Sequence, residues 1–148
     1  MNFAVICEGW KNRKLPIFNG IAYSDGYVDR FNIDYYDDNN YERKTINRKR
    51  VKIELSSIEV DYFSNVTIYG KVSSKEKRIT VIYGGGSDGS EGFIVVESHE
   101  QKIIWLAFFE ESNEFECCEI IENNIIAYNN LGDKWVFDID CPSNLRII

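Results

Sequence analysis

The stretch from Ile103 to Phe109, with the sequence IIWLAFF, decides the fold of this chain. All of its residues are apolar, so an extended strand running through it would have hydrophobic side chains on both faces. A strand with one face in solvent would alternate apolar and polar residues instead. We therefore expect this stretch to form a central strand that is covered on both sides and lies at the heart of the core.

Further apolar runs lie on both sides of this stretch and recur at intervals of about ten residues. Polar segments such as residues 75–78 and 129–133 separate them and have the composition of turns. Asn19-Gly20 and Asp25-Gly26 predict hairpin turns, because such pairs readily adopt the positive φ that tight hairpins require. The expected strands cover residues 2–9, 51–55, 66–72, 79–83, 93–97, 103–111, 115–122, 125–128 and 135–139.

Two segments interrupt this rhythm. Residues 37–50 form a long polar run, which we expect to be a loop, with one weak helix beginning near Asn40 as the alternative. After Ser56 and Ser57 the apolar positions change from odd to even numbers. This change predicts a bulge or a bend if the same face of the strand stays buried.

The fold class follows from this pattern. A length of 148 residues suits one domain, and 44% apolar residues suffice for a core, which excludes intrinsic disorder. Strands at short and regular spacing predict an all-β protein. We expect a single domain over residues 1–148, a mostly antiparallel β-sandwich or partly open barrel built from hairpins and meanders, with at most one short helix.

Motifs that would indicate catalysis fail in their context. Residues 84–89 (GGGSDG) match the G-x-G-x-x-G pattern of dinucleotide-binding proteins, but a strand-like run from Phe93 follows where that motif requires a helix. We interpret the segment as a flexible, glycine-rich hairpin loop. His99 is the only histidine, and a hydrolase would need it beside a cysteine or a carboxylate in a cleft. The sequence therefore predicts no enzyme, no cofactor and no metal site.

Cysteines and termini indicate the compartment. Cys7, Cys117, Cys118 and Cys141 lack the CxxC or Cys/His spacing of a metal site, and we expect free thiols in a reducing environment. Residues 1–10 lack the positively charged start of a secretory signal. No apolar run approaches the roughly 18 residues of a membrane span. We expect a cytoplasmic protein that does not contact a membrane.

Charge is distributed unevenly along the chain. The formal net charge is −7, but residues 1–78 contain 14 Lys and Arg against 11 Asp and Glu, whereas residues 79–148 contain 3 against 13. Phosphate binding needs clustered cations, so nucleic acid is disfavoured as a partner. A basic protein partner is favoured, because long-range attraction to an acidic surface speeds the encounter.

Acidic residues of the C-terminal strands are the candidate binding residues. In the strand from Phe115, alternation places the even-numbered residues, including Cys118, on one face and most odd-numbered residues on the other. In the last strand it places Asp138 and Asp140 outside. The alternative is that these carboxylates only keep an aromatic-rich sheet soluble and its edges unpaired. The candidate partner-binding residues are Glu110, Glu114, Glu116, Glu119, Glu122, Asp138, Asp140 and Tyr128, with Trp10, Tyr35 and Tyr36 as further aromatic anchors.

A small, acidic, all-β domain of this kind resembles the immunity proteins of bacterial toxin–immunity systems. The resemblance rests on size, on a composition rich in Asn, Ile and Lys, and on the acidic and aromatic stretches at residues 103–121 and 129–140. Proteins of that class neutralise a cognate toxin domain, often a basic nuclease, by covering its active site with an acidic surface. The resemblance thus implies a non-enzymatic inhibitor of a basic toxin.

A small-ligand-binding protein is the alternative function. Tyrosines and tryptophans would then line a cavity beneath the loop of residues 84–92. A deep apolar pocket would favour this function, whereas a filled core with a flat acidic surface would favour protein binding.

Overall fold

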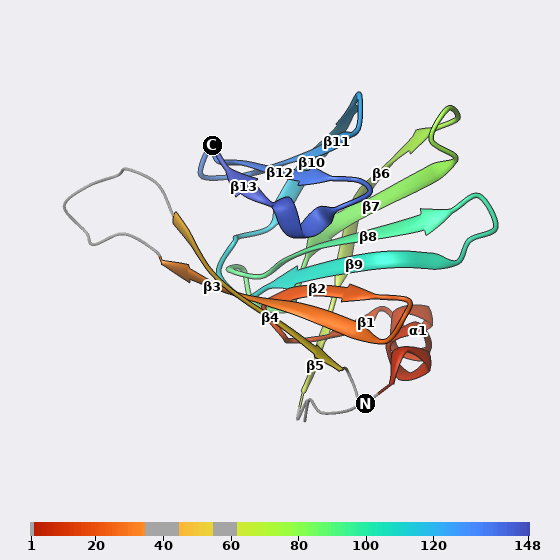
Figure 1. Ribbon diagram of the computed structural model, residues 1–148, viewed down its shortest axis with the longest axis horizontal. Coiled ribbons are helices and arrows are strands. Elements are labelled where there is room, and N and C mark those ends of the chain that lie inside the picture. The colour runs from red at the N-terminus through yellow and green to blue at the C-terminus, as the bar shows by residue number, and fades with distance from the viewer. Residues whose placement is uncertain (1, 35–44, 55–61) are drawn as a thin grey trace.

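The computed structural model describes residues 2–34, 45–54 and 62–148, with side chains for residues 2–31, 54 and 62–148. Most of the described residues belong to antiparallel strands, which form three sheets (Figure 1). One short α-helix, α1 (Phe3–Lys11), precedes all the strands in the chain.

A seven-stranded antiparallel sheet is the largest part of the structure. Its strands are β2 (Gly20–Tyr23), β3 (Tyr27–Asp34), β4 (Thr45–Glu54), β6 (Thr67–Ser74), β7 (Ile79–Gly85), β8 (Gly92–Ser98) and β9 (Ile103–Phe109). They lie in the order β4-β3-β2-β9-β8-β7-β6, so β9 is the central strand. The meander β2–β3–β4 joins the meander β6–β7–β8–β9 through the antiparallel pair of β2 and β9.

Smaller elements cover both faces of this sheet. Figure 1 shows the blue C-terminal strands on one side and the red helix on the other. The helix side also carries a two-stranded sheet of β1 (Lys14–Pro16) and β5 (Phe63–Asn65). The C-terminal sheet has the order β10-β11-β12-β13, and a 3-10 helix, η2, precedes its last strand. The bounds of these C-terminal elements are β10 (Phe115–Ile121), β11 (Asn124–Asn129), β12 (Lys134–Asp138), η2 (Pro142–Asn144) and β13 (Arg146–Ile147).

Side chains of β9 point alternately into two apolar clusters. Trp105, Ala107 and Phe109 belong to the cluster between the two large sheets. Leu106 and Phe108 belong to the cluster beneath α1. All five side chains are 2% exposed or less. The prediction that this stretch is a central strand covered on both sides is confirmed.

The beginning of β9 departs from the alternation. The register against β8 shifts between the pairs Val96–Trp105 and Glu97–Ile103, which makes Ile104 an extra residue. Ile103 is therefore turned into the cluster beneath α1, although Trp105, two residues later, points into the other cluster.

The predicted fold class is confirmed. Two antiparallel sheets pack face to face, as in a sandwich, and the sheets do not close into a barrel. From residue 66 onward, each expected strand is present, and its ends lie within two residues of the predicted ones. Asp25-Gly26 forms the predicted hairpin turn between β2 and β3, with Gly26 at a φ of +91°.

Residues 2–9 form most of α1, so the strand predicted there is wrong. Asn2 caps the helix, because its side chain accepts a hydrogen bond of 3.1 Å from the backbone N–H of Val5. Ile6 and Trp10 lie about one helical turn apart and are both buried. The apolar residues of this segment therefore form one face of a helix, which the cap and the burial of Ile6 and Trp10 both stabilise.

Asn19-Gly20 is not a hairpin turn, because the strands that it connects, β1 and β2, belong to different sheets. Asn19 has a φ of +50°, and its Oδ1 accepts a hydrogen bond of 2.8 Å from the N–H of Glu110. A Cβ on Gly20 would lie 2.1 Å from the carbonyl oxygen of Asp29. The glycine is required by this close approach of two strands and not by a turn.

The loop expected over residues 37–50 is wrong in its second part. The edge strand β4 begins at Thr45 and pairs with β3, with Thr45 opposite Asp34. Charged residues suit an edge strand, since they discourage pairing with other chains. Residues 35–44 and the predicted bend near Ser56 lie outside the described residues.

Candidate functional site

Strand β10 and the residues that flank it carry four of the predicted binding residues, Glu114, Glu116, Glu119 and Glu122, and β10 lies at one edge of the C-terminal sheet. Its register against β11 shifts between Phe115 and Cys117, so Glu116 is an extra residue in a bulge. As a result, Phe115 and Cys118 both point into the core. The predicted alternation, which put these two residues on opposite faces, is wrong because of this bulge. Glu116, Cys117 and Glu119 are exposed.

Glu114, just before β10, lies against the edge of the seven-stranded sheet. It packs on Gly85 of β7, where a Cβ would lie 2.5 Å from its Cγ. Tyr69, on β6, lies beside the Glu114 carboxylate. Hydrogen bonding to this carboxylate, partial burial and the nearby charges of Glu114 and Glu116 raise the pKa of Tyr69 to about 12. Tyr69 is nevertheless 44% exposed, so its ring remains accessible.

A second tyrosine–glutamate pair lies on the outer face of the C-terminal sheet. The hydroxyl of Tyr128, on β11, donates a hydrogen bond of 2.9 Å to Oε2 of Glu119. This bond raises the pKa of Tyr128. The ammonium of Lys134 lies 5.8 Å from the centroid of the same ring. A carboxylate, a phenol and a cation therefore occupy neighbouring strands of this face.

Asp138 and Asp140 hold the end of the β10–β11 hairpin. Their side chains accept hydrogen bonds of 3.1 and 3.0 Å, respectively, from the amide of Asn123. Oδ1 of Asp138 also accepts from the backbone N–H groups of Asp140 and Cys141. Glu122, next to Asn123, is exposed at the hairpin turn with a φ of +54°. Strand β11 separates β12 from β10, so Asp138 and Asp140 meet the hairpin end rather than the side of β10.

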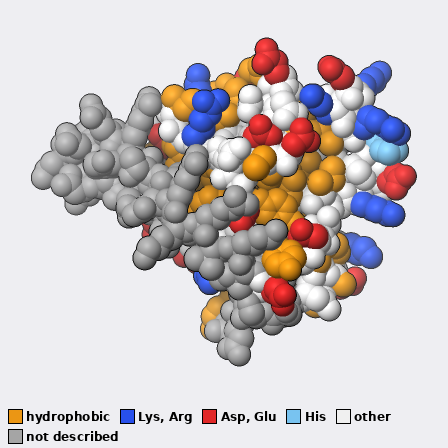
Figure 2. Space-filling view, in the orientation of Figure 1, with side chains coloured by type: hydrophobic (Ala, Val, Ile, Leu, Met, Phe, Trp, Pro, Cys, Tyr) orange, Lys and Arg blue, Asp and Glu red, His pale blue; other side chains and the backbone are white. Residues whose placement is uncertain are grey.

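The remaining predicted residues lie elsewhere. Glu110 is exposed at the end of β9, close to Asn19. Trp10, predicted as a surface anchor, is only 6% exposed. Tyr35 and Tyr36 lie outside the described residues. Figure 2 shows the acidic side chains of the face in view as separate groups among hydrophobic and uncharged atoms.

The glycine-rich loop between β7 and β8 is a hairpin loop, as predicted, and a buried carboxylate holds it. Glu91 is 5% exposed, and its Oε1 accepts hydrogen bonds from Oγ of Ser64 (2.8 Å) and the N–H of Asp88 (3.1 Å). The hydroxyl of Ser64 in turn accepts from the N–H of Ser87 (3.0 Å). These bonds give the loop defined contacts, which the sequence did not indicate.

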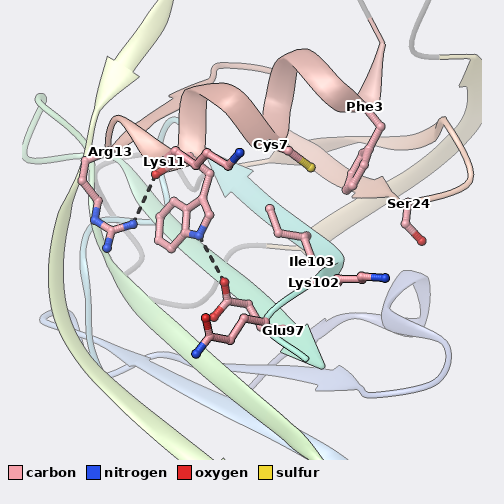
Figure 3. Close-up of a pocket in the computed structure, with 10 residues that line it drawn as sticks. Phe3, Cys7, Lys11, Arg13, Ser24, Glu97, Lys102 and Ile103 are labelled. Atoms are coloured by element: carbon pink, nitrogen blue, oxygen red, sulfur yellow. Dashed lines mark hydrogen bonds between the residues drawn. The ribbon is translucent and has the colours of Figure 1, made fainter. Parts of the chain in front are cut away.

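A cavity of about 680 Å³ opens between α1 and the adjacent ends of β8 and β9 (Figure 3). Phe3, Cys7 and Trp10 of the helix form one wall, and Ile103 forms the opposite wall. The sequence prediction placed an aromatic cavity beneath the loop of residues 84–92, whose residues do not line this cavity. Sequence reasoning missed it because residues 2–9 were assigned to a strand; the spacing of Phe3, Cys7 and Trp10 was the helical signal.

Polar groups of this cavity are arranged around Trp10. Its indole N–H donates a hydrogen bond of 3.4 Å to Oε2 of Glu97 (Figure 3). The guanidinium carbon of Arg13 lies 4.7 Å from the indole centroid, and Nη1 donates to the carbonyl oxygen of Trp10. Burial raises the pKa of the Cys7 thiol, so this side chain is uncharged near neutral pH. Lys11 and Lys102 also line the cavity.

A smaller cavity of about 320 Å³ lies beside His99. Nη2 of Arg78 lies 2.8 Å from Nε2 of the histidine. A guanidinium can only donate, so Nε2 accepts this bond and the ring proton lies on Nδ1. The carboxylate of Glu100 is 3.9 Å from the same nitrogen. The bond to Arg78 engages the lone pair that a general base would use.

Other chemical features can be stated for the described residues. All four cysteines are free. The described part of the chain holds no group of three or more His, Cys, Asp or Glu side chains that could bind a metal ion. Among the same residues, no helix is both long enough and apolar enough to cross a membrane.

The fold and these features define a mostly antiparallel β-protein of the sandwich type with one N-terminal helix. No protein-family model, curated protein or solved structure matches the chain.

Proposed function

We propose that this chain is a non-enzymatic, cytoplasmic protein-binding domain, and that β10 with its flanking residues binds a basic surface of another protein. In its finer form, the proposal is an immunity protein that neutralises a basic bacterial toxin. The observation that carries the proposal is the hydrogen bond of 2.9 Å between Tyr128 and Glu119 beside β10, together with a second tyrosine, Tyr69, that lies next to Glu114.

Each of the two tyrosine–glutamate pairs can bind an arginine side chain of a partner protein. The face of a phenol ring attracts a guanidinium, and the adjacent carboxylate accepts its N–H groups. Each carboxylate is already held by a tyrosine, so less side-chain freedom is lost on binding. Ile121, which is 48% exposed on the same strand, adds an apolar contact, as in the cores of protein–protein interfaces.

Charge supports the same choice of partner. Residues 79–148 contain 13 Asp and Glu against 3 Lys and Arg, and such an excess costs self-repulsion. A cationic partner relieves the repulsion and is attracted from a distance. The resemblance to immunity proteins supplies the finer form of the proposal, since those proteins present acidic surfaces to basic toxins.

A binding and protection experiment tests the proposal. A basic protein encoded next to the gene for this chain is the candidate partner; it is produced as a purified domain, and its association with this chain is followed by stopped-flow fluorescence. The double variant Glu116→Lys and Glu122→Lys reverses two exposed charges on either side of Glu119. We expect its association rate at low salt to fall by about tenfold or more. Co-production of the unaltered chain should restore growth of cells that make the neighbouring protein.

The matched control is Glu8→Lys with Asp25→Lys, which makes the same change in net charge at exposed residues of α1 and of the β2–β3 turn. We expect this variant to associate within about twofold to threefold of the unaltered chain, because distant exposed charges are screened. Equal slowing by both double variants would contradict a binding surface on β10. A hydrolytic activity of the chain that is lost in His99→Ala would contradict a non-enzymatic function.

A further inference from the structure

The cavity beneath α1 has apolar walls whose side chains are held in place by specific contacts and by a bulge. Trp10 is fixed by an edge-on contact with Phe93, with ring centroids 5.7 Å apart. Ile103 faces the same side because the bulge at Ile104 turns it out of its expected alternation. Figure 3 shows Phe3, Cys7 and Ile103 directed toward the space between the helix and the strands. The volume of about 680 Å³ falls within the range, roughly 300–1,000 Å³, of sites that enclose small organic molecules.

Cations and carboxylates meet at the mouth of this cavity. Three cations line it, Lys11, Arg13 and Lys102, against the single carboxylate of Glu97. That carboxylate accepts the indole N–H of Trp10. Two further carboxylates, Glu8 and Glu100, lie beside Lys11 and Lys102, so the charges at the mouth are balanced by partners that a ligand anion could replace.

Two of these cations are available to a ligand. Lys11 lies 3.9 Å from Glu8, and Lys102 lies 3.8 Å from Glu100, in pairs whose side chains are largely exposed. Exposed pairs of this kind contribute little to stability, so exchanging them for a ligand anion costs little. Arg13 is held over the ring of Trp10 and adds a fixed positive charge at the same wall.

We propose that this cavity binds a small organic anion with an apolar body, such as an aromatic or medium-chain aliphatic carboxylate or sulfonate. The apolar part lies between the helix and Ile103, and the anionic group lies at the mouth near Lys11 and Lys102. This site is separate from β10 and is independent of the proposed protein-binding function.

Binding of 8-anilinonaphthalene-1-sulfonate, an apolar aryl sulfonate, tests the proposal. We expect one saturable site on the folded protein, measured by fluorescence and by calorimetry. Decanoate should displace the probe, and decanol, which has the same chain length without the charge, should displace it at least about tenfold less well. Near-ultraviolet circular dichroism, recorded on the same samples, verifies that the protein keeps its tertiary packing, because the probe also binds loosely folded chains.

Variants locate the site. Lys11→Glu with Lys102→Glu should weaken binding of the probe by about tenfold or more, whereas Lys71→Glu with Lys77→Glu, the same charge change on exposed residues of β6 and the β6–β7 turn, should change it less than about twofold. Cys7→Phe should weaken binding by narrowing the cavity between α1 and Ile103. Glu116→Lys with Glu122→Lys should leave it intact, which separates this site from β10. Binding that is absent, or equal in all folded variants, would overturn the proposal.

Discussion

Trp105 and Trp135 are both enclosed between the two large sheets, and they differ in one hydrogen bond. Nε1 of Trp105 donates a bond of 3.0 Å to the carbonyl oxygen of Ile139. Nε1 of Trp135 meets no acceptor among the described residues. A buried polar group without a partner costs free energy, so the two indoles contribute differently to stability although each is 2% exposed or less.

The same substitution at both positions tests this difference. Trp105→Phe leaves the Ile139 carbonyl unpaired, whereas Trp135→Phe removes a donor that has no partner. We expect Trp105→Phe to lower the free energy of unfolding by about 1–2 kcal/mol more than Trp135→Phe. Urea denaturation followed by circular dichroism measures both values. A larger loss in Trp135→Phe would show that packing of the indole, rather than its N–H, decides the outcome.

The Tyr69–Glu114 pair predicts a pH dependence. The pKa of Tyr69 is raised from 10.0 to about 12, so the neutral phenol is favoured in the folded protein. Its contribution to stability is therefore fully present below pH 10 and is lost as the pH rises through about 12. NMR titration of the tyrosine Cζ signals should show Tyr69 titrating late. Glu114→Gln should bring its pKa back toward 10, and an unchanged pKa in this variant would contradict the hydrogen bond.

At the scale of elements, two bulges and one cap determine how the strands and the helix present their side chains. The bulge at Glu116 puts Phe115 and Cys118 on the same face of β10. The bulge at Ile104 turns Ile103 toward α1. Asn2 begins the helix whose residues form the other wall of the cavity. Each bulge, and the helix that the cap begins, changes the face on which a side chain lies. The alternation of apolar and polar residues in the sequence does not reveal this change.

The N-cap of α1 can be tested directly. Asn2→Ala removes the side-chain acceptor of the Val5 N–H, and we expect it to lower the free energy of unfolding by about 1 kcal/mol. Asn2→Asp is the matched control, because it keeps an acceptor and places a negative charge at the helix N-terminus. It should be as stable as the unaltered protein or slightly more stable. Equal losses in the two variants, measured by urea denaturation, would contradict the capping role.

Strand positions were predictable from sequence, whereas the first helix and the grouping of the site residues were not. Alternation and turn residues are local signals, so strands from residue 66 onward were located to within two residues. The apolar residues before Lys11 fit the repeat of a strand as well as that of an α-helix. Their spacing alone therefore did not distinguish the two, and Asn2 was not identified as a helix cap. The candidate acids lie in separate groups, and this division depends on the bulge at Glu116 and on β11 lying between β10 and β12, which no local pattern indicates.

At the scale of the whole molecule, the large sheet separates two unlike surfaces. The acidic strand β10 belongs to the sheet on one face, and the cavity lined by cations lies beneath the helix on the other. The net charge of −7 is an average over residues 1–78, with 14 Lys and Arg against 11 Asp and Glu, and residues 79–148, with 3 against 13. The two proposed sites lie on opposite faces of the large sheet.

The sequence by itself determined the strand content, the burial of both faces of β9 and the acidity of the C-terminal strands, because these follow from the residue types along the chain. Only the tertiary structure decided that β2 pairs with β9, which registers contain bulges, and that a cavity forms under α1. The physical reason is that pairing partners and cavity walls come from residues far apart in the chain. Tertiary packing determines these contacts, and they cannot be read from the pattern of neighbouring residues in the sequence.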